Sequence, residues 1–101
     1  MVEINWTKDA IEDANQIAIF ISQSSSKYAR IQIERFFERT IILETFPKSG
    51  RIVPEINDLK IRELIIGNYR IIYKIVSKKS IDILTIHLSQ RLLKNNPNIK
   101  K

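Results

Sequence analysis

The chain has 101 residues, of which 44% are hydrophobic and 28% are charged, and its formal net charge is +6. A chain of this length and composition predicts one small folded domain, residues 1–101, and excludes a disordered protein. There is no cysteine and only one histidine, which excludes disulfides, thiolate metal sites and multi-histidine metal centres. We therefore expect neither a metal nor a cofactor.

The apolar runs of the chain argue against a membrane protein. The longest of them, such as residues 17–21, are far shorter than the roughly 20 residues that span a bilayer. The chain does not open with a charged segment followed by an apolar one, the pattern of a secretory signal. These features predict a cytoplasmic protein with no membrane partner.

The positive charge is concentrated in the second half of the chain. Residues 1–46 contain 5 Lys and Arg against 7 Asp and Glu, whereas residues 47–101 contain 12 against 4. Such a field attracts polyanions or an acidic protein segment. The alternative is an ordinary solvated surface with a lysine-rich tail.

The first half of the chain predicts a strand followed by two helices. Apolar residues alternate over residues 2–6, which is typical of a half-buried strand. Thr7 can then cap a helix, and Ser25 or Ser26 can cap a second one. Apolar residues recur three and four positions apart over residues 10–21 and again over residues 29–41, so we expect two amphipathic helices in an antiparallel hairpin.

The second half predicts a loop and three strands. Pro47 ends the second helix, and residues 47–60 contain two prolines and a glycine, as expected of a loop. Gly67 and Asn68 then join two strand-like runs, which indicates a two-residue hairpin. A second tight turn at residues 78–79 leads into a third strand, and residues 92–101 are predicted to be a flexible tail. The predicted fold class is α+β: an N-terminal strand, a helical hairpin and a three-stranded antiparallel meander, with the helices on one face.

Two-residue turns fix which strand residues lie opposite each other. We pair Ile66 with Tyr69 and Ser77 with Ser80. This register predicts a helix-facing set that comprises Leu64, Ile66, Tyr69, Ile71, Tyr73, Ile75, Leu84, Ile86 and Leu88. It places on the more open face Ile61, Glu63, Ile65, Arg70, Ile72, Lys74, Ile81, Ile83, Thr85 and His87.

On the open face, Arg70 is predicted to lie directly opposite His87 and diagonally from Glu63. These three residues are the candidate catalytic residues, because a guanidinium binds phosphate in a fixed fork and an imidazole transfers protons near neutral pH. The alternative is a structural ion pair between Arg70 and Glu63, with His87 as a bystander. We also expect Arg70 to be exposed, so that its removal leaves the fold intact.

Four segments together resemble the RelE/ParE family of toxins from type II toxin–antitoxin systems. These segments are "PKSGR", "VPE", "IRELIIGNYRIIYKI" and "IDILTIHLSQRL". The resemblance covers nearly the whole chain and implies a small twisted sheet with a helical hairpin. It also implies a cognate antitoxin, acidic and encoded by the adjacent gene, that wraps the toxin.

The family contains two chemistries. RelE-type toxins cleave messenger RNA on the ribosome with basic residues on the open sheet face, whereas ParE-type toxins inhibit DNA gyrase. On the RelE pattern, Arg70 would stabilise charge on the phosphate, Lys60 and Arg62 would match a basic pair on the preceding strand, and His87 would match an acid or base. The resemblance also brings in Arg51 and Arg91 as target-binding candidates, each with a structural alternative.

Departures from the RelE pattern favour the ParE branch. No tyrosine follows Tyr73, whereas many of these nucleases stack an aromatic residue near the C terminus on a base. In the predicted register, Lys60 and Arg62 fall on the face opposite to Arg70, unless a bulge at Gly67 reverses the alternation. Three hypotheses therefore stay open: a gyrase inhibitor, a ribosome-dependent endoribonuclease, and an inactive relative that only binds.

Overall fold

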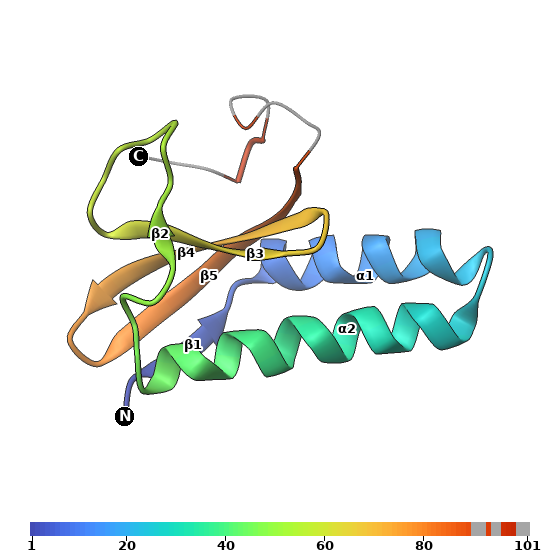
Figure 1. Ribbon diagram of the computed structural model, residues 1–101, viewed down its shortest axis with the longest axis horizontal. Helices are drawn as coiled ribbons and strands as arrows, with labels where there is room; N and C mark the ends of the chain where they lie inside the picture. The colour runs from blue at the N-terminus through green and yellow to red at the C-terminus, as the bar shows by residue number, and fades with distance from the viewer. Residues whose placement is uncertain (90–92, 94–95, 99–101) are drawn as a thin grey trace.

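The computed structural model describes residues 1–89, 93 and 96–98. One sheet lies over a pair of antiparallel helices, which confirms the predicted α+β class (Figure 1). In chain order, the elements are β1 (Glu3–Trp6), α1 (Lys8–Ser22), α2 (Ser26–Ile41), the short 3₁₀ helix η1 (Ile42–Glu44), β2 (Arg51–Ile52), β3 (Ile61–Ile66), β4 (Tyr69–Ser77) and β5 (Ser80–Leu88).

The sheet has five strands in the order β1-β5-β4-β3-β2. Strands β3, β4 and β5 form the predicted antiparallel meander. The N-terminal strand β1 pairs in parallel with β5, and the two-residue β2 pairs with β3. Strand β2 lies inside the segment that we predicted as a loop. The sequence did not predict it, because a strand of two residues shows too little alternation of apolar and polar residues.

Both helices begin at the predicted polar caps. The hydroxyl of Thr7 accepts a hydrogen bond from the backbone N–H of Ala10 at 3.1 Å, and the hydroxyl of Ser25 accepts one from Tyr28 at 3.2 Å. Each hydroxyl accepts a hydrogen bond from a backbone N–H of the first helical turn, which has no carbonyl partner within the helix. The sequence therefore sets the starts of α1 and α2 locally.

The hairpin between β3 and β4 has the predicted two-residue turn. Ile66 pairs with Tyr69, and no register shift interrupts this strand pair. Gly67 adopts a φ of 58°, a left-handed conformation that costs glycine little. Because no bulge occurs here, Arg62 stays opposite Tyr73, on the face that we predicted for it.

The pairing of β4 with β5 corrects part of the face assignment. Both ends keep the predicted register, with Arg70 opposite His87 and Ser77 opposite Ser80. Between them the register shifts twice, once between Ile72 and Tyr73 and once between Ile75 and Ser77. A shift of one residue moves side chains to the other face.

Three residues of β5 therefore lie on the face opposite to the predicted one. Ile81 and Ile83, expected on the open face, are fully buried in the core against the helices. Leu84, expected in that core, packs against the cluster on the other face.

The face away from the helices is also less open than expected. A second apolar cluster covers part of it and contains Val53, Ile56, Ile61, Ile72 and Leu93. Val53 and Ile56 come from the segment between β2 and β3, so this segment is anchored onto the sheet. The candidate site consequently lies beneath a loop, not on a bare surface.

The predicted flexible tail, residues 92–101, lies largely outside the described residues and stays a prediction. The part that the structure describes contacts the sheet: Leu93 is buried, and the side chain of Asn96 bonds to Thr85. Within the described part of the chain, no helix has the length and apolarity to cross a bilayer.

Candidate functional site

Glu63 lies at the centre of an ion-pair cluster on the face away from the helices. Its side chain, on β3, has no exposed surface. One carboxylate oxygen accepts from Nε of Arg70 at 2.5 Å, and the other accepts from Nε of Arg51 at 2.5 Å. A buried carboxylate needs such partners, because it has lost its hydration.

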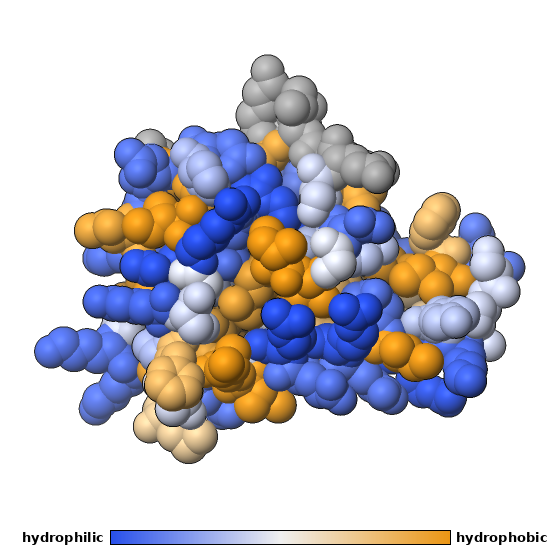
Figure 2. Space-filling model, viewed as in Figure 1, coloured by the Kyte–Doolittle hydropathy of each residue, from blue (hydrophilic) through white to orange (hydrophobic). Residues whose placement is uncertain are grey.

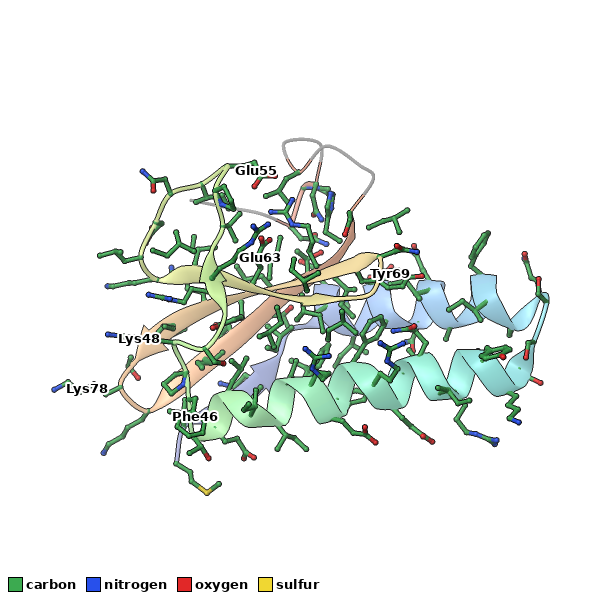
Figure 3. All side chains as sticks on the ribbon, viewed as in Figure 1. Phe46, Lys48, Glu55, Glu63, Tyr69 and Lys78 are labelled. Atoms are coloured by element: carbon green, nitrogen blue, oxygen red, sulfur yellow. The ribbon has the colours of Figure 1, made fainter. Side chains whose placement is uncertain are left out.

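Arg70 is held between two carboxylates. In addition to Glu63, it binds Glu55, whose oxygens accept from the two terminal nitrogens of the guanidinium at 2.7 and 2.8 Å. This bidentate geometry is the strongest common form of an arginine–carboxylate contact. Figure 3 shows Glu55 above Glu63, on the side of the sheet away from the helices.

The burial of Arg70 corrects our expectation that its side chain is exposed. Only 9% of the side chain is accessible, and the bonds to Glu55 raise the pKa of the guanidinium above its already high usual value. The structure therefore contains the predicted ion pair between Arg70 and Glu63. Glu55, which the sequence did not single out, completes the cluster.

His87 lies opposite Arg70 in the strand register, as predicted, and is buried. Its Nδ1 lies 3.0 Å from the side-chain nitrogen of Asn96, which also donates to the hydroxyl of Thr85 at 3.2 Å. The amide oxygen of Asn96 accepts from the backbone of Asn98 at 2.9 Å, so the nitrogen faces the histidine. With this amide orientation, Nδ1 of His87 is the acceptor.

Asp13 extends this polar network to α1. Its carboxylate accepts from the hydroxyl of Thr85 at 2.5 Å and from the backbone N–H of Ile86 at 3.2 Å. The network borders a groove of about 750 Å³ between α1, β5 and the described C-terminal residues. The groove is lined by Asp13, Gln16, Ile17, Phe20, Tyr69, Ile86, His87, Leu88, Asn96, Pro97 and Asn98.

The remaining basic candidates do not converge on Arg70. The guanidinium of Arg62 donates to the backbone carbonyls of Leu59, Lys48 and Gly50, so it braces the loop before β2. Lys60 is exposed in the turn before β3.

The other two target-binding candidates are Arg51 and Arg91. Arg51 joins the cluster through Glu63 and is itself 59% exposed. Arg91 lies outside the described residues, so its predicted role stays a prediction.

A family model for the ParE toxin of the type II toxin–antitoxin system parDE matches residues 4–93. The chain belongs to the ParE toxin family. Among solved structures, "Chromosomal ParDE TA system from P. aeruginosa" matches with a TM-score of 0.71 at 20% identity, over 87% of this chain and 96% of that one. That likeness supports the fold. A comparison with curated proteins finds no match.

In this ParE-family chain, the arrangement limits what Arg70 can do. Its fork is filled by Glu55 and its Nε by Glu63, so a phosphate would have to displace a bidentate carboxylate next to a second buried anion. The ring of His87 contacts the side-chain amide of Asn96. Of the three predicted catalytic residues, Arg70 and Glu63 form an ion pair, and the register places His87 beside Arg70.

Two participants were missed from the sequence. Glu55 follows a proline in a loop, and Asn96 lies in the C-terminal segment, so neither belongs to a periodic element that would fix its position. Two signals were available for Glu55: it is one of only four acidic residues after residue 46, and it ends the segment "VPE" that contributes to the family resemblance. For Asn96 there was no signal.

The pair between Glu55 and Arg70 predicts a pH dependence of stability. The hydrogen bonds from Arg70 lower the pKa of Glu55 from 4.5 to about 2. A depressed pKa contributes stability that is present above pH 4.5 and is lost as the pH falls from 4.5 towards 2. Because the side chain is 48% exposed, we expect this contribution to be only about 1 kcal/mol.

Urea denaturation at several pH values checks this expectation. Glu55→Gln should flatten the fall in the free energy of unfolding between pH 4.5 and 2. An unchanged pH profile in this variant would show that Glu55 does not carry the effect.

Proposed function

We propose that this chain is the toxin of a type II toxin–antitoxin pair and that it stops growth by inhibiting DNA gyrase, without cleaving RNA. The observation that carries the proposal is the burial and ion pairing of Arg70, the residue best suited to bind phosphate. It is buried and bonded to both Glu55 and Glu63. A gyrase inhibitor of the ParE family needs no free arginine on this face.

Electrostatics supports the choice against RNA cleavage. An RNA strand on this face would bring its phosphates towards the buried carboxylate of Glu63 and the half-exposed carboxylate of Glu55. These two carboxylates neutralise the guanidinium charges of Arg70 and Arg51, so the cluster offers a phosphate little net attraction. Arg62, a candidate for the basic pair of a nuclease, is occupied with loop carbonyls.

The two alternatives become outcomes of the test. A RelE-like ribosome-dependent endoribonuclease would use Arg70, His87 and Lys60 on RNA after rearrangement of the ion-pair cluster. An inactive relative would bind partners without stopping growth.

The proposed regulatory partner is an acidic antitoxin encoded by the adjacent gene. The net charge of +6 favours an acidic partner, and the matching solved structure is described as a ParDE toxin–antitoxin system. The groove between α1 and β5 suits a segment that folds on binding, because both apolar and polar side chains line it. The cytoplasm is the proposed location, since both gyrase and ribosomes work there.

Expression of the chain without its antitoxin tests the proposal. We expect incorporation of labelled thymidine to fall before incorporation of labelled methionine, because inhibition of gyrase stops replication first. A control culture expresses the toxin together with its antitoxin and should retain both signals. Prior loss of methionine incorporation, with cut messages, would favour the endoribonuclease. Normal growth with soluble toxin would favour the inactive relative.

A further inference from the structure

Large apolar side chains are exposed together where α2 ends. Ile41 closes α2, Ile42 opens η1, and Phe46 follows η1; they are 58%, 48% and 60% exposed. The backbone N–H of Phe46 donates to the carbonyl of Ile42 at 2.9 Å, so these residues belong to one compact turn. We call these three residues the α2-end surface. Figure 2 shows an apolar patch at this end of the molecule, where Figure 3 labels Phe46.

The loop next to the α2-end surface is held rigidly. The hydroxyl of Tyr73 donates to the carbonyl of Pro47 at 2.8 Å and accepts from the backbone N–H of Gly50 at 3.0 Å. From the other side, Arg62 donates to the carbonyls of Lys48 and Gly50 at 3.3 and 3.0 Å. Binding through this loop therefore requires little further ordering, which favours affinity.

The surroundings of this surface are rich in lysine. Lys48 follows Phe46, and Lys78 and Lys79 form the turn between β4 and β5; all three are exposed. Figure 3 shows Lys48 and Lys78 at the same end of the molecule as Phe46. The ion pairs found within the described residues involve none of these lysines. Acidic residues also lie at this end: Glu38 is on α2, Glu44 is in η1, and the backbone N–H of Glu3 donates to the carbonyl of Lys79 at 2.8 Å. The charge of the rim that does not lie beside Glu3 is that of Lys48, on the loop after Phe46.

This combination suits a protein better than a nucleic acid. A phenylalanine can stack on a base, but the two isoleucine side chains beside it gain nothing from bases or phosphates. Apolar anchors in a polar rim are typical of protein interfaces. The lysine rim favours an acidic partner surface. Side chains that protrude at about half exposure or more suit pockets on an already folded partner, whereas the groove between α1 and β5 suits a segment that folds on binding.

We propose that the α2-end surface, with Lys48 on its rim, docks the toxin onto its cellular target through an acidic protein surface that carries apolar pockets. The inference rests on the proposed function, under which that target is DNA gyrase. The groove between α1 and β5, where we propose that the antitoxin binds, is lined by none of these residues. Loss of target binding is therefore separable from loss of antitoxin binding.

Surface variants test this separation. Phe46→Ser removes the aromatic anchor, and Lys48→Glu reverses the rim charge without touching the apolar residues. Tyr28→Ser is the matched control, because Tyr28 is an equally exposed aromatic residue, 66% accessible, at the other end of α2. The measurements are thermal melting, affinity for the antitoxin, and the toxin level that arrests growth, with inhibition of purified gyrase as a separate assay.

We expect Phe46→Ser and Lys48→Glu each to raise the toxin level needed for growth arrest at least tenfold, with melting and antitoxin affinity nearly unchanged. Tyr28→Ser should stay within twofold of the wild type. Full potency of both surface variants would overturn the proposal, as would a parallel loss of antitoxin affinity. If wild-type toxin arrests growth but leaves gyrase active, the proposed function fails, and the growth data still decide whether this surface docks the target.

Discussion

Arg70→Ala is expected to lower the free energy of unfolding by about 3–5 kcal/mol, because it breaks a buried ion pair and leaves Glu63 partly uncompensated. The remaining partner of Glu63 is Arg51, which is 59% exposed and neutralises a buried charge less well. Urea denaturation near neutral pH measures the loss. Glu55 also loses its only ion-pair partner among the described residues, which adds to the cost.

Arg51→Ala is the matched control, since it removes the exposed member of the same cluster. We expect it to cost about 1 kcal/mol or less. If Arg70→Ala is as stable as the wild type, the ion-pair cluster does not hold the loop to the sheet. Loss of toxicity in Arg70→Ala alone would say nothing about RNA chemistry, because the fold is weakened at the same time.

Gly50→Ala is expected to destabilise the chain by roughly 1–3 kcal/mol, through overpacking. A Cβ at this position would lie 2.6 Å from the backbone oxygen of Glu63 and 2.7 Å from the hydroxyl of Tyr73. The backbone oxygen cannot move without disturbing β3, and the tyrosine ring is fully buried. Thermal melting and urea denaturation measure the effect.

The neighbouring exposed residue provides the comparison. Ser49→Ala adds no atoms to this contact and should change the free energy of unfolding by no more than about 0.5 kcal/mol. Equal stability of Gly50→Ala and Ser49→Ala would mean that the close approach of the loop to Tyr73 is relaxed in solution. In that case Tyr73 would not hold the loop in one conformation, and Phe46 and Lys48 would not be ordered before binding.

The sequence predicted the locally encoded parts of the fold. The caps and the turn at Gly67 each depend on a few adjacent residues. The cap Thr7 and the turn were predicted correctly, and Ser25 is one of the two serines predicted for the second cap. Arg70 was placed opposite His87 by extending the pairing at the turn of residues 78–79 along both strands, and this pairing is correct because the two register shifts between them compensate. These predictions needed no knowledge of the tertiary contacts.

The shifted centre of the β4–β5 pair could not be predicted in the same way. The two register shifts compensate each other, so the ends of the strands match the simple alternation while the middle does not. Ile81, Ile83 and Leu84 are all large and apolar, and either face offered them burial. Only the packing against the helices and against the loop decides between the two faces.

The candidate site was predicted in its residues but not in its environment. Glu63 and Arg70 were brought together by alternation along the strands, which is a local rule. The carboxylate of Glu55 arrives from a loop whose path depends on Val53 and Ile56 packing onto the sheet. This non-local contact buries Arg70 and fills its guanidinium fork with the carboxylate of Glu55.

Inhibition of DNA gyrase by the purified toxin, released from its antitoxin, tests the proposed function most directly. Relaxed plasmid, gyrase and ATP are incubated with increasing toxin, and supercoiling is followed by gel electrophoresis; heat-inactivated toxin is the control. We predict that supercoiling falls with toxin concentration, while messenger RNA on programmed ribosomes stays intact. Unchanged supercoiling together with cleavage of that messenger RNA would contradict the account.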